Sequence, residues 1–302
     1  MGAAGGVATR LVVRLLGEGH AVFGIDQRPW VGAPVEYYEG DLRLRSAERA
    51  FGAWRPDVVV HMDPAASPFA DDDDRRGSLV EMTRTVFDYC KAHGVEHCVQ
   101  VSRHTFYGAG SGLPLFRLEH EPASDTHGFP RLADVVAADT FATNVLWRVP
   151  ELVTTVLREC YTLGPTGHGT LALYLRAKRV PVVLGFDPLI QLIHEEDAIS
   201  ALVRTIERRP RGVFNIAGPP PLPLSDVIRE AGRIPVSIPE FAFAGLLGRF
   251  GLPPLDRGAI SHLKFPIVVD SSAFRTCANF SFAHDVLGTI HAFRDAFPPS
   301  GQ

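Results

Sequence analysis

The N-terminal segment contains residue types that could bind a phosphate. Gly2, Gly5 and Gly6 stand directly before a stretch with helical spacing that begins at Thr9. Glycines permit a tight turn and let backbone amides approach a pyrophosphate at a helix N-terminus. Asp26 ends a short apolar run about twenty residues further on, where a carboxylate can accept hydrogen bonds from ribose hydroxyls. The pattern predicts a dinucleotide site, and the carboxylate favours NAD because it disfavours the extra phosphate of NADP.

Strands and helices alternate along the first half of the chain and would position these residues. Short apolar runs, typical of strands buried on both faces, alternate with amphipathic stretches. They predict strands at 21–25, 58–60, 98–102 and 154–158 and helices at 9–16, 79–92 and 133–146. This alternation indicates parallel βαβ units with right-handed crossovers. We therefore expect an α/β fold, a Rossmann-like doubly wound parallel sheet.

The regular alternation of strands and helices does not continue in the second half of the chain. Strands are expected at 181–184 and 213–216, but prolines at 219–221 and 253–254 interrupt the segment, and an apolar helix is expected between them at 241–250. We predict a dinucleotide-binding domain at 1–169. Residues 170–302 are expected to form mainly a smaller substrate or capping lobe that closes over the cleft, with some return to the main sheet.

A set of short motifs follows in a characteristic order. They lie at residues 2–8, 40–42, 57–61, 101–108, 118–122, 163–165, 193–197 and 214–218. Together they resemble the landmarks of the extended short-chain dehydrogenase/reductase family, and most of all its NAD-dependent nucleotide-sugar epimerase/dehydratase branch. The first motif is similar to the TGxxGxxG loop of that family, with Ala8 in place of the last glycine. The resemblance covers essentially the whole chain.

The resemblance implies further properties of the site. Asp41 and Leu42 match the family's Asp-hydrophobic pair, which lies beside the adenine. NAD is the implied cofactor, a small molecule the implied substrate or effector, and a homodimer through helices 79–92 and 133–146 the implied assembly. The segment 193–197 carries His, Glu and Asp in a row, but its implied role is structural, and we expect no metal site.

The first strand of this fold is missing from the sequence. In the order 3-2-1-4-5-6 it lies in the middle of the sheet, and it should supply about five or six apolar residues. Only Met1 precedes Gly2. We expect either that the true start lies upstream of Met1 or that another segment fills the position, and we favour the upstream start.

The catalytic pair of the family is also missing. Its members use Tyr-x-x-x-Lys on the helix that follows the fifth strand, where the lysine lowers the tyrosine pKa so that the phenolate can move a proton. No tyrosine occurs between Tyr107 and Tyr161, and no lysine occurs between Lys91 and Lys178. The pair is therefore absent whatever the alignment.

Two registers remain open for the empty positions. The tyrosine position falls on Phe129 and the lysine position on Ala133, or, if Asp139 matches a usual acidic position, on Arg131 and Val135. Neither register can carry out the proton transfer. The chain is therefore expected to be a degenerate member of the family.

Three other residues are weak candidates for acid/base chemistry. They are Ser102, His104 and His127. Ser102 stands just before the usual Ser/Thr position, which Arg103 occupies. The two histidines lie in segments that should flank the nicotinamide. Histidine titrates near neutrality and could replace the tyrosine. We expect an NAD-binding protein that is weakly active or non-catalytic. The alternative is an NAD-dependent epimerase or oxidoreductase that uses nonstandard acid/base residues on a nucleotide-sugar or another hydroxyl or carbonyl substrate, with Arg158 and Arg176 on a substrate phosphate.

Composition excludes several classes of partner. The net charge is only −4, which gives no reason to expect nucleic acid or an anionic membrane as a partner. The four cysteines are scattered without CxxC spacing, so buried thiols are expected rather than a metal site or a disulfide framework. No signal peptide and no membrane-spanning run are recognised, and a cytoplasmic location is expected.

Overall fold

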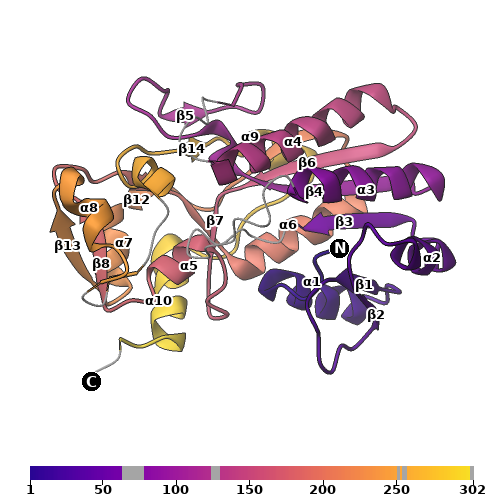
Figure 1. Cartoon of the computed structure of the whole chain (residues 1–302), viewed down its shortest axis with the longest axis horizontal. Helices are drawn as coiled ribbons and strands as arrows, with labels where there is room; N and C mark the ends of the chain where they lie inside the picture. The colour runs from indigo at the N-terminus through magenta and orange to yellow at the C-terminus, as the bar shows by residue number, and fades with distance from the viewer. Residues whose placement is uncertain (63–77, 124–129, 250–251, 254–256, 300–302) are drawn as a thin grey trace.

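The structure is a computed structural model, and it describes the 302-residue chain except for residues 63–77, 124–129, 250–251, 254–256 and 300–302. A parallel sheet with helices on both faces forms its centre (Figure 1). The strand order β11-β6-β4-β3 comprises β11 (Gly212–Ile216), β6 (Val153–Glu159), β4 (His97–Arg103) and β3 (Val58–Met62). The α/β fold expected from the sequence is confirmed.

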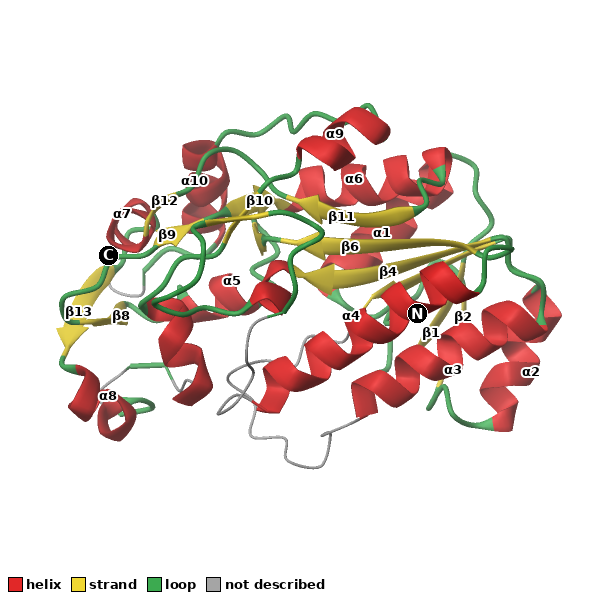
Figure 2. Cartoon of the chain, turned by 90° about the horizontal axis from the view of Figure 1, so that it is seen from above, coloured by secondary structure: helices red, strands yellow, loops and turns green. Residues whose placement is uncertain are grey.

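Two helical layers cover this sheet. Figure 2 shows α3 (Ser78–Ala92) and α4 (Pro130–Arg148) along one face. On the other face, α1 (Gly6–Gly17) packs on α6 (Glu195–Arg208) through Leu11 and Leu202, which share a core with Val101 and Leu157 of the strands. Because both faces of the sheet are covered, most residues of β4 and β6 are buried, polar ones included.

A second parallel pair continues the sheet beyond β3. The strand β1 (Phe23–Asp26) pairs with β2 (Glu36–Glu39), and α2 (Arg45–Trp54) follows. Among the described residues, Met1 and Gly2 lie between the carboxyl ends of β1 and β3. The Met1 ammonium donates to the Val60 carbonyl (2.6 Å), and the Gly2 amide donates to the Ile25 carbonyl (2.9 Å).

A smaller lobe lies at the other end of the molecule (Figure 1). Its sheet pairs β8 (Arg179–Val183) with β13 (Ile234–Ile238), beside α7 (Leu224–Glu230) and α8 (Glu240–Leu246). Its core contains Val180, Val227 and Phe243. The helix expected at 241–250 is one residue earlier at its start and ends at Leu246. The strand β11 lies in the main sheet, although it follows β8 in the chain.

The remaining elements belong to one of the two parts or join them. They are η2 (His104–Tyr107), β5 (Phe116–Arg117), β7 (Tyr161–Leu163), α5 (Thr170–Tyr174), β9 (Leu189–Ile190), β10 (Leu192–His194), β12 (Leu222–Pro223), η3 (Arg257–Leu263), β14 (Val268–Val269), α9 (Ser272–Cys277) and α10 (Val286–Ala296). Within the described residues, no helix is long and apolar enough to span a membrane.

Candidate functional site

The N-terminus of α1 has neither a side-chain cap nor an acidic residue in its first turn. The helix begins at Gly6, its N-cap Gly5 makes no side-chain capping bond, and its first turn carries no acidic residue. The first amides of a helix have no partner within the helix, and they lie at the positive end of its dipole. An anion can therefore bind to these amides without competition from an acidic side chain or a cap.

Close contacts surround two of the predicted loop glycines, and at Gly2 the contact is with backbone. Gly2 has a φ of +74°, and a Cβ atom there would lie 2.3 Å from the Met62 carbonyl oxygen. A Cβ on Gly6 would lie 1.7 Å from Cδ2 of His168, so the imidazole rests against the start of α1. Any other residue at position 2 would displace the end of β3 from the loop.

The Asp26 carboxylate fixes the same loop from the end of β1. It accepts from the Ala4 amide (3.0 Å), from the Arg28 amide (3.0 Å) and from the Arg28 guanidinium (3.0 Å). Burial raises the pKa of Asp26, but the hydrogen bonds from Arg28 and Ala4 outweigh it and hold the pKa below its ordinary value. A ribose hydroxyl bound here would share the Asp26 carboxylate with Arg28. The sequence pattern did not indicate this contact with Arg28.

Asp41 and Leu42 lie directly beyond the neighbouring strand. The Gly40 amide donates to the Asp26 carbonyl (2.9 Å), which brings this segment against the end of β1. Asp41 is engaged by Arg43, whose Nη2 lies 2.6 Å from its carboxylate. Leu42 is buried. All six residues predicted to bind the cofactor therefore gather where β1, β2 and the start of α1 meet.

A buried polar network occupies the region of the expected catalytic centre. Ser102 donates to Asp139 (2.7 Å), and the Arg158 guanidinium binds the same carboxylate through two nitrogens (2.8 and 3.0 Å). Arg158 also donates to the Tyr107 hydroxyl (2.9 Å), which donates to Asn215 (2.8 Å). The network joins α4 to β4, β6 and β11. The Ser102 hydroxyl is thus hydrogen-bonded to the Asp139 carboxylate inside this network.

His104 is a poor candidate for a proton donor in this structure. Its side chain is only 2% exposed, and its Nδ1 lies 3.1 Å from the Glu159 carbonyl oxygen. Burial lowers the pKa of His104 to about 3, so the imidazole is neutral at pH 7. His127, the third candidate, lies outside the described residues.

The strands bring together a residue pair that the sequence reasoning missed. Arg103 and Glu159 are register partners at the carboxyl ends of β4 and β6. Burial raises the pKa of Glu159 to about 7, although the charge of Arg103 opposes this shift. The Tyr161 ring meets His104 edge-on, with centroids 4.5 Å apart. Neither local spacing nor a motif could have indicated this pair, because its members lie on two different strands that are far apart in the chain.

The arginines considered for a substrate phosphate have other roles. Arg158 is 3% exposed and committed to Asp139. The Arg176 guanidinium carbon lies 4.4 Å from the centroid of the Phe297 ring, and its Nη2 donates to the Gly167 carbonyl (3.3 Å). The expectation that Arg158 meets a phosphate is therefore wrong, because its guanidinium is already bound in the interior.

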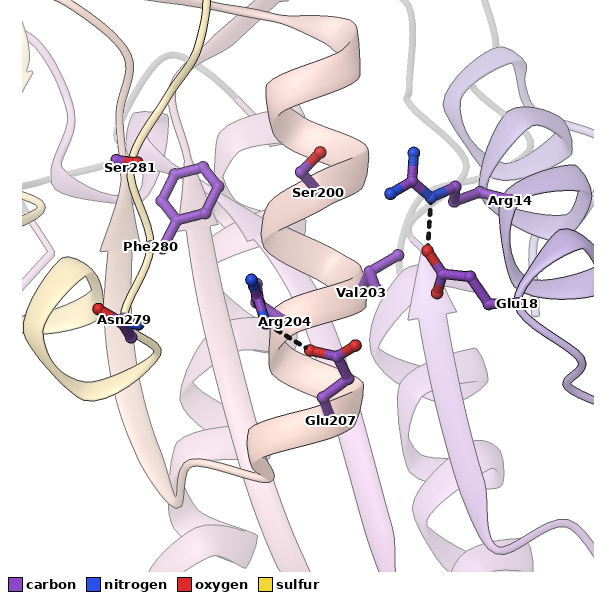
Figure 3. A pocket seen from close by; sticks show the side chains of 9 residues that line it. All are labelled: Arg14, Glu18, Ser200, Val203, Arg204, Glu207, Asn279, Phe280 and Ser281. Atoms are coloured by element: carbon purple, nitrogen blue, oxygen red, sulfur yellow. Dashed lines mark hydrogen bonds and ion pairs between the residues drawn. The ribbon is translucent and has the colours of Figure 1, made fainter.

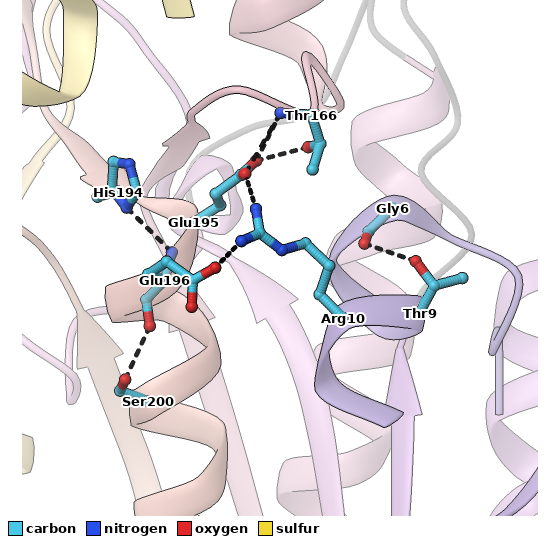
Figure 4. Close-up of polar contacts among 8 residues, drawn as sticks. All are labelled: Gly6, Thr9, Arg10, Thr166, His194, Glu195, Glu196 and Ser200. Atoms are coloured by element: carbon cyan, nitrogen blue, oxygen red, sulfur yellow. Dashed lines mark hydrogen bonds and ion pairs between the residues drawn. The ribbon is translucent and has the colours of Figure 1, made fainter. Parts of the chain in front are cut away.

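The acidic segment at the start of α6 makes ion pairs and hydrogen bonds within the chain. Arg10 of α1 forms ion pairs with Glu195 and Glu196, and Glu195 also accepts from the amide and hydroxyl of Thr166 (Figure 4). His194 caps the helix by accepting from the Glu196 amide (3.1 Å). These contacts fix the start of α1 relative to α6. Within the described residues, no group of His, Cys, Asp and Glu is arranged to share a metal ion.

A separate hollow lies beside α1 and α6. It has a volume of about 270 Å³ and lies between α1, α6 and residues 279–281 (Figure 3). Its charged side chains pair with one another, Arg14 with Glu18 and Arg204 with Glu207. The hollow is lined by the C-terminal halves of α1 and α6, away from the glycine loop, and is not part of the candidate site.

Comparison with known proteins places the chain in a family. The model of the NAD dependent epimerase/dehydratase family matches residues 1–217. The chain belongs to this family. Uncharacterised proteins of Mycobacterium bovis and Mycobacterium tuberculosis are 30% identical to it over 277 residues, which is 88% of this chain and 72% of theirs.

Solved structures agree with the fold. MoeE5 in complex with UDP-glucuronic acid and NAD superposes with a TM-score of 0.76 at 20% identity, covering 98% of this chain and 96% of that one. UDP-glucose 4-epimerase of Thermotoga maritima, with UDP-glucose, has a TM-score of 0.76 at 18% identity over the same shares. The NAD complex of the Thermus thermophilus epimerase has a TM-score of 0.74 at 19% identity, covering 99% and 98%.

Proposed function

We propose that the protein binds NAD at the edge formed by the glycine loop, Asp26 and Asp41. The observation that carries this proposal is the uncapped start of α1 beside the ionised Asp26 carboxylate. The α1 amides would hold the pyrophosphate, Asp26 the adenosine ribose, and the segment of Asp41 and Leu42 would lie beside the adenine. Family membership and the NAD complexes among the similar structures support the proposal.

The contacts at the glycine loop suit such a ligand. Gly2 and Gly6 place no side chain of their own between the α1 amides and an incoming phosphate, the His168 imidazole lies against Gly6, and Arg10 holds α1 in place against α6. Bound NAD supplies hydride transfer. His168 lies against Gly6 and would donate to the pyrophosphate.

We further propose that turnover is weak or absent. The Tyr-x-x-x-Lys pair is missing from the sequence, and Ala133 and Val135 stand at the two open lysine positions on α4. Without that lysine, the family's usual means of lowering the pKa of a proton donor beside the ribose is missing. The protein would then use NAD as a bound ligand, as a sensor or as a partner subunit.

Calorimetric titration with NAD tests the binding. We expect binding to the full chain and a loss of about tenfold in affinity in Asp26→Asn, because a hydrogen bond to a charged group contributes about 1.5–3 kcal/mol. Asp226→Asn is the matched control, since Asp226 is an exposed carboxylate of α7 that pairs with Arg229. Absence of binding at millimolar NAD would refute the proposal.

A second function rests on Glu159. A carboxyl group with a pKa of about 7, at the carboxyl ends of the strands, suits a general base near neutral pH. It would make the protein an epimerase or oxidoreductase with a nonstandard acid/base residue, acting on a nucleotide-linked sugar. This alternative uses Glu159 in place of the buried His104.

The rate of sugar-nucleotide turnover distinguishes the two functions. With UDP-glucose and NAD as the probes, a Glu159 base predicts a rate that increases with pH through about 7. Glu159→Gln should abolish that dependence and lower the rate at least tenfold, whereas Glu207→Gln, at the far end of α6, should not. No measurable turnover in the unsubstituted chain would leave the non-catalytic function.

A further inference from the structure

The last residues of β4 and β6 point alternately to the two faces of the sheet, as side chains of a strand do. Ser102 and Arg158 are register partners, and both of them contact Asp139 of α4. The next pair in the register is Arg103 with Glu159. This pair therefore points to the face opposite α4.

The face opposite α4 is the one that α1 and α6 cover (Figure 2). Val101 and Leu157 lie two residues before the pair on their strands, so they point the same way, and they share a core with residues of both helices. The glycine loop lies at the same edge of the sheet, because Gly2 contacts Met62 at the carboxyl end of β3. Ligands of such sheets bind at this edge.

Arg103 supplies a positive charge at these strand ends. Its side chain is half-buried. Burial raises the pKa of Glu159 to about 7 and that of Tyr161 to about 12, and the charge of Arg103 opposes both shifts, so the guanidinium lies close to both groups. Among the residues that the structure describes, none forms a hydrogen bond or an ion pair with this guanidinium. Taking a charge out of water costs free energy unless an opposite charge accompanies it.

We propose that Arg103 binds the carboxylate of a sugar acid at this edge of the sheet, with Glu159 as a second hydrogen-bond partner of the same carboxylate. The planar guanidinium matches a carboxylate through two parallel N–H···O bonds. One guanidinium balances the single charge of a carboxylate but not the nearly double charge of a phosphate. This inference rests on the proposed function, because NAD at the glycine loop would leave these strand ends to a second ligand.

Glu159 can bind such a ligand only in its protonated form, because two ionised carboxyl groups repel each other. A pKa of about 7 makes the protonated form available near neutral pH, and its O–H group can donate to the ligand. The other titratable groups nearby are Tyr161 and His104, both uncharged at pH 7, and His262 of η3, whose charge acts on His104. A Glu159 that keeps its proton is not a general base, so the inference belongs with the non-catalytic function.

Calorimetric titration with two matched pairs of ligands tests the site. The pairs are UDP-galacturonate with UDP-galactose, and free galacturonate with free galactose; in each pair a carboxylate replaces a hydroxymethyl group. We expect the acid to bind at least about tenfold more tightly than its neutral partner. A preference in both pairs indicates the free acid as the ligand, whereas a preference confined to the UDP pair indicates a nucleotide-linked acid.

Substitutions locate the source of the preference. Arg103→Gln should remove it, and Arg103→Lys should retain part of it, because an ammonium group keeps the charge without the planar fork. Arg204→Gln is the matched control, since Arg204 is an exposed arginine of α6 that pairs with Glu207, and it should keep the full preference. Circular dichroism checks the folding of each variant, and Arg103→Lys decides if Arg103→Gln does not fold.

The pH dependence tests the part played by Glu159. In the unsubstituted chain the preference should decrease from pH 6 to pH 8, because Glu159 loses its proton through about 7. Glu159→Gln keeps a hydrogen-bond donor without a titrating group, so it should keep the preference and lose this decrease. A decrease that persists in Glu159→Gln would assign the titration to another group, such as His262, and would remove Glu159 from the site.

Repeating the titrations with and without saturating NAD separates this inference from the proposed function. Equal affinity for the acid and its neutral partner in both pairs, absence of binding included, overturns the inference, even if NAD binds. A preference for the acid that Arg103→Gln leaves intact overturns it as well. A preference that Arg103→Gln removes supports it, and failure of NAD to bind would then refute only the proposed function.

Discussion

Replacing Asp139 with Asn should destabilise the protein far more than the same change at an exposed ion pair. The Asp139–Arg158 pair has an N···O distance of 2.8 Å, with side chains 0% and 4% exposed. The Asp226–Arg229 pair has the same 2.8 Å distance, but its side chains are 45% and 61% exposed. Removing one partner of a buried pair costs about 3–5 kcal/mol because an uncompensated charge remains, whereas exposed pairs contribute about 0–1 kcal/mol.

The contacts of Arg158 show why the larger value applies. Burial alone would lower the pKa of Arg158, but the hydrogen bonds and charge of Asp139 hold it above its ordinary value. Asp139→Asn keeps the size of the side chain and removes the charge. At about 2–4 °C per kcal/mol, we expect the Tm to fall by on the order of 10 °C.

Urea and thermal unfolding followed by circular dichroism would measure both variants. The combined variant Asp139→Leu with Arg158→Met removes both charges, and we expect it to recover at least about 2 kcal/mol relative to Asp139→Asn. Ser102 loses its acceptor in that variant, which prevents full recovery. If Asp139→Asn and Asp226→Asn destabilise equally, the reasoning from burial is refuted.

Three further outcomes are expected. Gly2→Ala should lose at least about 2 kcal/mol more than Gly19→Ala in urea unfolding, because both residues have positive φ but only Gly2 has a backbone atom (2.3 Å) in the way. Burial lowers the pKa values of His61 and His104 to about 3, so below pH 6.5 the unfolded chain binds more protons than the folded chain. The free energy of unfolding should therefore fall by about 2 kcal/mol per histidine between pH 7 and pH 5. An unchanged free energy of unfolding over this range would contradict the burial of the two histidines. His168→Ala should weaken NAD binding in calorimetry roughly fivefold, the effect of one lost hydrogen bond of about 1 kcal/mol, and equal affinity would remove His168 from the site.

Sequence reasoning predicted the elements of the main sheet well because their signals are local. The strand expected at 58–60 is Val58–Met62, and the helix expected at 79–92 is Ser78–Ala92. Short strands such as β9 and β14 were not predicted, because two residues carry no periodicity. Their pairing depends on partners far away in the chain.

The candidate site was predicted in part. The glycines and Asp26 are recognisable because their spacing repeats a motif whose geometry the backbone imposes. Arg28 on the Asp26 carboxylate is a local contact that the motif does not encode. Strand register places Glu159 opposite Arg103. The packing of α4 on the sheet forms the ion pair between Arg158 and Asp139.

By itself, the sequence determined the fold class, the glycine loop and the absence of the Tyr-x-x-x-Lys pair, since each depends only on which residues are present and how they are spaced. Only the tertiary structure decided which charges are buried and what they face. It placed Arg158 and His104 in buried contacts and Glu159 at the carboxyl ends of the strands. Burial and pairing depend on contacts between distant segments, and the spacing of residues along the chain does not specify them.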